Sequence, residues 1–293
     1  MFAMPELCKK QVLALLFYAL YASEGLLKSN NILAYSCLNL YIEKNFISAR
    51  VMKYAIISDI HGNLEALESV LAEIDKVKAD SLLCLGDIVG YGPNPNECVE
   101  LIKKRADVSL AGNHDYAPLG KLDLSYFNPW AKSAIEWTAS QLNQESIDFL
   151  LSLPLKKEMN GFTIVHATPG EPDGWNYIIT IGDAVKNFPE FNGQVCFIGH
   201  SHVPMVVAVN GSDEYRVIRE NPVRIEPNMR YIINVGSVGQ PRDFIPKAAF
   251  AIYETDSQLY ELFRVEYDIA ETQSKIFKSG LPTFLAERLE LGQ

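Results

Sequence analysis

The organisation of this chain is decided by the stretch Met52-Lys53-Tyr54-Ala55-Ile56-Ile57-Ser58-Asp59-Ile60-His61. Its apolar centre is typical of a buried strand, and the strand ends on an aspartate and a histidine at alternate positions. A helical pattern follows over 64–77, with apolar residues on one face. Strand, polar loop and helix in this order build open α/β sheets, in which ligands bind beyond the carboxyl ends of the strands.

The same order recurs along the next fifty residues. A buried run over 81–85 ends at Gly86-Asp87 and precedes a helical pattern over 96–104, and a short strand over 108–110 ends at Gly112-Asn113-His114-Asp115. We therefore predict parallel strands joined by right-handed crossovers. Helical patterns over 129–141 and 145–151 predict an inserted cap or flank.

From residue 162 onward the pattern changes to short strands. We predict them over 162–166, 195–198, 205–209, 215–218, 231–234, 248–253 and 259–265. These strands predict a second sheet packed on the first, followed by terminal helices over 269–278 and 283–289. Because the sequence contains no internal repeat and no low-complexity linker, we expect residues 52–293 to form one domain.

Residues 1–51 differ in character from the rest. Lys9 and Lys10 precede an apolar stretch from Val12 to Ala22 that is too short to span a bilayer. We interpret residues 1–51 first as an N-terminal extension, either dispensable or preceding a true translation start at Met52. The second interpretation is a pair of amphipathic helices packed on the body, and the last is a secretory signal.

All five histidines of the chain lie in short motifs at predicted strand ends. The motifs are Asp59-Ile60-His61, Gly112-Asn113-His114-Asp115, Val165-His166-Ala167 and Gly199-His200-Ser201-His202, to which Gly86-Asp87 adds a carboxylate. Taken singly, each motif has an ordinary explanation, such as a turn, a helix cap or a core histidine. Together they supply the imidazole nitrogens and carboxylate oxygens that bind Zn, Mn, Fe or Ni in hydrolytic sites, and they predict a dinuclear metallohydrolase.

Charge and cysteine content narrow the classes of function. The formal net charge of −10 argues against a general nucleic-acid or anionic-membrane binder, and it favours small phosphoesters over long polyanions. The five cysteines are widely spaced and form no Cys-x-x-Cys pair. This usage indicates a reducing compartment, so we expect a cytoplasmic protein.

The ordered motifs D-x-H, G-D, G-N-H-D, a lone H and G-H-x-H resemble the calcineurin-like metallophosphoesterase superfamily, and most of all its small bacterial and archaeal phosphodiesterase-like branch. The resemblance implies an α/β fold, a four-layer α/β/β/α sandwich in which two packed mixed β-sheets are flanked by helices. After Gly86-Asp87 the chain continues Ile88-Val89-Gly90. Protein phosphatases and diadenosine tetraphosphate hydrolases have Asp-Arg-Gly there, so their phosphate-gripping arginine and their histidine-orienting aspartate are missing from this motif.

The resemblance also implies a role for each motif residue. The ligands of the first metal would be Asp59, His61 and His202, those of the second Asn113, His166 and His200, and the ligand that bridges both Asp87. His114 matches the non-ligand histidine that assists the leaving group, and Asp115 or another carboxylate would hold its imidazole. We expect two divalent ions, with manganese ahead of iron, zinc or nickel.

The implied reaction is hydrolysis of a phosphodiester or phosphomonoester by a metal-bridging hydroxide, with His114 as general acid. Two alternatives stay open: a non-catalytic scaffold of the same fold, and a hydrolase specific for a nucleotide or diadenosine polyphosphate. Asn63, Ser237 and Arg242 are candidates for substrate binding, the last two within the glycine-rich turn over 236–243. We expect a small phosphoester as partner and neither general nucleic-acid binding nor a membrane, and homo-oligomerisation is left open.

Overall fold

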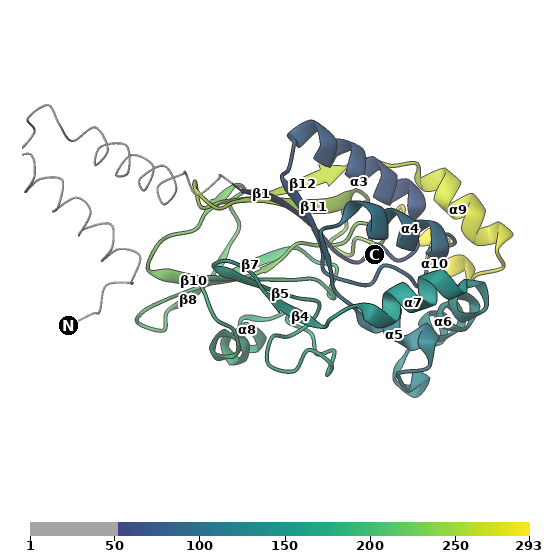
Figure 1. Ribbon diagram of the computed structural model, residues 1–293, viewed down its shortest axis with the longest axis horizontal. Helices are drawn as coiled ribbons and strands as arrows, with labels where there is room; N and C mark the ends of the chain where they lie inside the picture. Colours follow the sequence, from purple (N-terminus) through teal and green to yellow (C-terminus); the bar gives the residue numbers. More distant parts are fainter. Residues whose placement is uncertain (1–51) are drawn as a thin grey trace, which may run out of the picture. The chain divides into compact units, whose positions relative to one another are not determined.

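The computed structural model describes residues 52–293, and the predictions for residues 1–51 lie outside the described residues. Two six-stranded sheets lie face to face, and helices cover their outer sides (Figure 1). The predicted four-layer α/β/β/α sandwich is therefore confirmed. In the described part of the chain, no helix has the length and apolar content needed to cross a bilayer.

The first sheet has the strand order β3-β2-β1-β11-β12-β9. Its strands are β1 (Lys53–Ile57), β2 (Ser81–Cys84), β3 (Val108–Ser109), β9 (Val223–Arg224), β11 (Ala248–Glu254) and β12 (Leu259–Val265). The first three pair in parallel, as predicted, and the other three add antiparallel. The crossovers are the helices α3 (Leu64–Val77) and α4 (Pro95–Arg105).

The prediction that 248–253 and 259–265 belong to the second sheet was wrong. β11 pairs with β1, with Ala55 opposite Ile252, and β12 follows as its hairpin partner. The parallel strands β2 and β3 lie on one side of β1, and the β11–β12 hairpin lies on the other. Apolar patterning shows that a segment is a buried strand, but it does not show which open edge the strand joins.

The second sheet has the strand order β4-β5-β6-β10-β7-β8. Its strands are β4 (Lys156–Glu158), β5 (Phe162–Val165), β6 (Val195–Ile198), β7 (Met205–Asn210), β8 (Tyr215–Ile218) and β10 (Met229–Asn234). The parallel strands β5, β6 and β10 lie in its centre. The sequence did not reveal β4, because this edge strand is Lys-Lys-Glu and has no apolar side chain to bury.

Side chains of β1 alternate between two cores. Tyr54 and Ile56 lie between the sheets, where they meet Phe162 and Phe197 of the second sheet. Ala55 and Ile57 face the other way and pack under α3 and α4. Because both faces of β1 are buried, its sequence is continuously apolar rather than alternating.

The remaining helices flank the two sheets. They are α5 (Asn113–Tyr116), α6 (Pro129–Gln141), α7 (Gln144–Ser152), α8 (Ile181–Asn187), α9 (Ile269–Lys278) and α10 (Thr283–Glu287). α8 covers the outer face of the second sheet (Figure 1), where Ala184 and the neighbouring Phe188 pack against Cys196 and Ile232. α8 was missed because it is only seven residues long.

Candidate metal centre

The predicted site residues come together at the carboxyl ends of the parallel strands of both sheets. Asp59 and His61 follow β1, Asp87 follows β2, and Asn113 and His114 start the helix after β3. His166 follows β5, and His200 and His202 follow β6. All eight side chains are buried. Loops from two sheets thus supply one cluster of polar groups.

One group of ligand atoms consists of Asp59, His61, Asp87 and His202, all within 4.8 Å of one another. His202 Nε2 lies 3.0 Å from His61 Nε2 and 3.4 Å from Asp59 Oδ1. His61 Nε2 lies 3.6 Å from Asp87 Oδ2. Two nitrogens and two carboxylates converging on one point form a donor set that suits a first-row divalent ion.

A second group shares Asp87 with the first and adds His166 and His200. His166 Nε2 lies 3.3 Å from Asp87 Oδ2. Asn113 Oδ1 is buried and has no hydrogen-bond partner among the described residues, and the same holds for His166 Nε2. Buried polar atoms are normally paired, so an amide oxygen and a ring nitrogen without partners beside the shared carboxylate fit a cation between them.

Each of the four predicted histidine ligands is oriented by a backbone carbonyl. The Nδ1 atoms of His61, His166 and His202 lie 3.2, 3.0 and 2.6 Å from the carbonyl oxygens of Val89, Leu85 and Gln240. For His200 it is Nε2 that lies 2.9 Å from the carbonyl oxygen of Trp175. When one ring nitrogen donates to a carbonyl, the other keeps its lone pair for a metal. The rings therefore offer Nε2 in three cases and Nδ1 in His200.

The backbone is strained at these positions. Left-handed φ angles between 53° and 68° occur at Asp59, His61, Asp87, His200 and His202. Such angles are uncommon outside glycine and cost roughly 1–3 kcal/mol each, so they persist only where surrounding contacts enforce them. Here the amides of residues 59, 60 and 61 donate to the carbonyl oxygens of residues 86 and 87. This bonding locks the loop after β1 to the loop after β2.

Burial and neighbouring charge shift the pKa values of the histidines in the two ligand groups in different directions. Burial lowers the pKa of His61 and of His202 well below the ordinary range, so both rings are neutral. Burial also lowers the pKa of His166, but nearby carboxylates, above all Asp87, outweigh it and raise that pKa to about 9. The same carboxylates that favour a positive charge on His166 would also favour a cation bound beside them.

His114 lies beside both groups but belongs to neither. Its backbone amide donates to Asp87 Oδ1 over 2.7 Å, and its ring packs against the rings of His61, Tyr91 and Phe127. Burial lowers its pKa to about 4, despite the opposing charge of Asp87. The ring also lines a cavity, which is the position required for a group that acts on a bound ester.

The expected partnership between Asp115 and the His114 imidazole was wrong. His114 Nδ1 has no hydrogen-bond partner among the described residues. The Asp115 carboxylate instead accepts four backbone amides, at 2.8–3.2 Å, from Asp87, Ile88, Val89 and Gly112. The carboxylate turns toward the loop after β2 because that loop has unpaired amide groups. Asp115 therefore stabilises the loop that carries Asp87 and does not bond to the His114 ring.

Comparison with known proteins agrees with this geometry. The model of the calcineurin-like phosphoesterase superfamily domain matches residues 52–258. The chain belongs to this superfamily. The match includes every predicted ligand, so the phosphoesterase domain and the ligand cluster are the same part of the chain.

The chain is similar to three known proteins over different shares of its length. An uncharacterised protein of Methanocaldococcus jannaschii is 46% identical over 82% of this chain and 98% of its own length. The crystal structure of a metallophosphoesterase from Sphaerobacter thermophilus has a TM-score of 0.73 and 43% identity, covering 83% of this chain and 100% of that chain. A symmetrical bis(5′-nucleosyl)-tetraphosphatase of Shewanella baltica is 28% identical over 43% of this chain and 47% of its own length.

Two of the three candidate substrate-binding residues are engaged in the phosphoesterase fold instead. Asn63 donates to the Gly239 carbonyl oxygen and accepts from Ala66 and Thr272, which uses its amide to cap α3. Ser237 donates to the Asp59 carbonyl oxygen, accepts from the Gln240 amide and is fully buried. Because both side chains are hydrogen-bonded within the fold, these bonds argue against contact with a phosphate, and their role in substrate binding stays a prediction. Buried turns need polar side chains of their own, and sequence does not separate that use from binding.

Arg242 is placed differently. Its guanidinium bonds to the Gln240 side chain and lies 5.7 Å from the centre of the Tyr91 ring. Its charge helps to lower the pKa of both His61 and His202, which places it within electrostatic reach of the first ligand group. Arg242 therefore stays a candidate for contact with phosphate oxygens.

Sequence reasoning missed most of the aromatic side chains at the centre. A cavity of about 510 Å³ is lined by Asn113, His114 and His200 together with Tyr91, Phe127, Trp175 and Tyr177. Tyr177 stacks on His200, with ring centres 4.1 Å apart. The only available signal was position, because Trp175 and Tyr177 follow His166 closely in a turn-rich loop.

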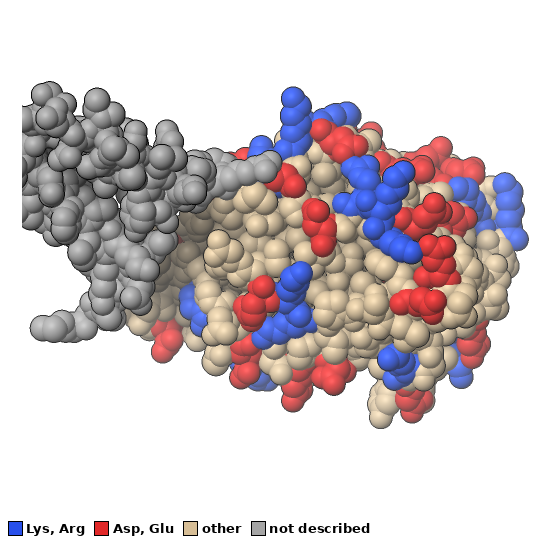
Figure 2. Space-filling model, viewed as in Figure 1, with Lys and Arg blue, Asp and Glu red and all other residues tan. Residues whose placement is uncertain are grey.

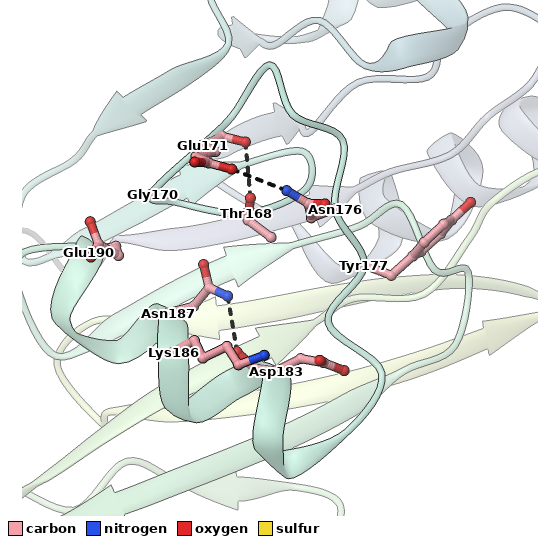
Figure 3. A pocket seen from close by; sticks show the side chains of 9 residues that line it. All are labelled: Thr168, Gly170, Glu171, Asn176, Tyr177, Asp183, Lys186, Asn187 and Glu190. Carbon is pink, nitrogen blue, oxygen red and sulfur yellow. Dashed lines mark hydrogen bonds between the residues drawn. The ribbon is translucent and has the colours of Figure 1, made fainter. Parts of the chain in front are cut away.

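A second cavity, also of about 510 Å³, lies between the loop after β5 and α8 (Figure 3). It is lined by polar residues such as Glu171, Lys186 and Glu190, and includes no predicted ligand. Tyr177 borders both cavities, and in Figure 3 it points away from the other labelled side chains. This second cavity therefore adjoins the first at Tyr177 but does not include the candidate metal centre.

Proposed function

We propose that this protein is a phosphoesterase that hydrolyses phosphodiester or phosphomonoester bonds with two divalent ions. The observation that carries the proposal is the pair of buried ligand groups that share Asp87. Residues 59, 61 and 202 would hold one ion and residues 113, 166 and 200 the other. When bound, such ions supply Lewis-acid activation of water and neutralise charge on phosphoryl oxygens.

The chain's own residues position the ester and handle the proton. His114 faces the cavity beside the shared carboxylate, where its ring can protonate the departing oxygen of an ester. The negative phosphoryl group beside the ring favours the protonated imidazole that this role requires. Arg242 supplies a further positive charge near the first ligand group.

Small phosphoesters are the partner class that we propose. On the face shown in Figure 2, acidic and basic side chains of the described residues are interspersed over the surface. A distribution of this kind does not attract a long polyanion over a large area. The net charge of −10 supports the same proposal, and the local positive charge would come from the bound ions.

Metal stoichiometry tests the proposal at the centre itself. We expect two ions per chain in protein loaded with Mn²⁺, one in His166→Gln and fewer than one in Asp87→Asn, because only Asp87 belongs to both groups. Asp183→Asn, which changes a partly buried helix-capping carboxylate on α8, away from both ligand groups, is the matched control and keeps both ions.

Hydrolysis of p-nitrophenyl phosphate and bis(p-nitrophenyl) phosphate by the same four proteins then reports the reaction. We expect turnover to follow metal content. Two bound ions with no turnover on monoesters, diesters or nucleotides would favour a non-catalytic scaffold instead, and absence of metal would contradict the proposed centre.

A further inference from the structure

The cavity beside the metal centre has walls that the predicted ligands do not account for. Asn113, His114 and His200 form its inner end, next to the second ligand group. Its outer walls come from two separate segments. Residues 121–128 follow the short helix α5, and residues 174–177 follow β5. A molecule in this cavity therefore reaches the centre at one end and contacts both segments at the other.

Aromatic rings dominate these outer walls. The side chain of Tyr126 is 89% exposed and that of Tyr177 is 51% exposed, and Phe127 and Trp175 lie behind them. Tyr177 has one face on His200, so its opposite face is available to a ligand. Tyr126 has no ring neighbour among the described residues. Rings left uncovered at the mouth of a catalytic cavity are suited to contact a ligand.

Charge at the cavity is sparse. Among the described residues that line it, Lys121 is the only lysine or arginine and Asp123 the only carboxylate. The outer part of the cavity therefore has no cluster of cations for a second phosphate group. Its contribution to binding has to come from contact with planar, largely apolar surface.

We propose that this cavity binds a planar aromatic ring attached to the phosphoryl group, so that aryl and nucleoside phosphoesters are preferred over alkyl esters. This inference rests on the proposed function, because it takes the metal centre as the place where the phosphoryl group binds. Tyr126 is the main stacking surface, and Tyr177 is the ring on the opposite segment. Stacking on tyrosine requires a flat π-face and little else, and it accepts any base or aryl group.

Equilibrium binding to the full chain carrying His114→Ala and loaded with Mn²⁺ tests the inference, because this variant is expected to keep both ions but to hydrolyse these esters only slowly. Calorimetry with methyl phosphate, phenyl phosphate and thymidine 5′-monophosphate compares three ligands with the same phosphoryl group. We expect Kd for the two aromatic ligands to be about tenfold lower than for methyl phosphate. Tighter binding of phenyl phosphate alone assigns the cavity to simple aryl esters, and tighter binding of both aromatic ligands assigns it to nucleosides as well.

Variants of Tyr126 separate stacking from other effects. Tyr126→Ala should reduce the ratio of the Kd for methyl phosphate to the Kd for phenyl phosphate to about one. Tyr126→Phe keeps the ring and should retain the preference for phenyl phosphate. Phe277→Ala removes an exposed aromatic ring from α9, outside the cavity, and should leave the ratio unchanged.

Equal Kd values for methyl and phenyl phosphate in the protein that keeps Tyr126 would overturn the inference, as would an unchanged preference after Tyr126→Ala. Failure of the proposed function gives a different result. The protein would then bind the aromatic ligands preferentially but hydrolyse no ester.

Discussion

The carboxylate of Asp115 accepts four backbone amides, three from the loop after β2 and one from the loop after β3. Its neighbour in sequence, His114, points into the cavity. Two adjacent residues in one motif thus have different surroundings, because Asp115 bonds to the loop that carries Asp87 and His114 lines the cavity. Motif matching identifies both positions, but only the direction of each side chain separates their roles.

His114→Ala should keep both metal ions and lose most turnover on esters with poor leaving groups. The reason is that the ring is a proton donor rather than a ligand, and general acid catalysis is worth roughly 10²–10⁴ in rate. Comparing kcat for a methyl ester and a p-nitrophenyl ester measures this, because p-nitrophenolate leaves without a proton. An equal loss on both esters would argue against the proton-donor role.

Asp115→Ala should destabilise the protein by at least about 3 kcal/mol, because four buried amides lose their acceptor together. Urea unfolding of the metal-loaded protein measures the change in the free energy of unfolding. Asp148→Ala, an exposed carboxylate on α7, is the control and should stay within about 0.5 kcal/mol of the unsubstituted protein. A small effect of Asp115→Ala would show that water replaces the carboxylate at this loop.

At the scale of elements, the helices over 64–77, 129–141 and 269–278 were predicted to the residue, because each has a clear apolar face and a polar cap. Strand identity was predicted almost as well, apart from β4 and β9, and so was the parallel pairing of β1, β2 and β3, but the partner of β11 was not. The hairpin of β11 and β12 carries the same apolar signal whichever sheet it joins. Its place beside β1 depends on which edge the rest of the fold leaves open.

The candidate site shows the same division between what sequence does and does not reveal. The strand ends predicted Asp59, Asp87 and the four histidine ligands, because parallel strands bring their carboxyl ends together. Tyr126 and Tyr177 had no such signal. Loops that fold over a centre follow from tertiary packing, which no local pattern encodes.

The junction of β3 and α5 offers a steric test of the centre. A Cβ atom on Gly112 would lie 2.1 Å from Asp87 Oδ1, although the backbone there, with a φ of −104°, accepts alanine without strain. Gly112→Ala should therefore displace the shared carboxylate and lower metal content below one ion per chain.

Gly211→Ala is the matched control for this substitution, since a Cβ there meets no atom within 4 Å. Elemental analysis of both variants decides the outcome. Full metal content in Gly112→Ala would mean that Asp87 is free to move aside. That result would contradict a rigid loop after β2.

For the whole molecule, metal removal should lower the melting temperature as well as the activity. Ions that bind only the folded state stabilise it in proportion to the logarithm of their concentration over Kd. For a domain of this size we expect chelation to lower Tm by roughly 5–10 °C, and added Mn²⁺ to restore it. Asp87→Asn, with its bridge removed, should show a much smaller shift, and an unchanged Tm in the unsubstituted protein would contradict buried metal binding.

The ligands come from the strand ends of two different sheets, which are joined where the His200 amide donates to the Asp59 carboxylate. Neither sheet alone can assemble either group, since each ion draws on residues before 114 and after 165. During synthesis the first sheet is also incomplete until β11 has been made. If the chain functions as proposed, the ions would bind only after both sheets have been synthesised, and a bound pair would report that the two sheets have packed together correctly.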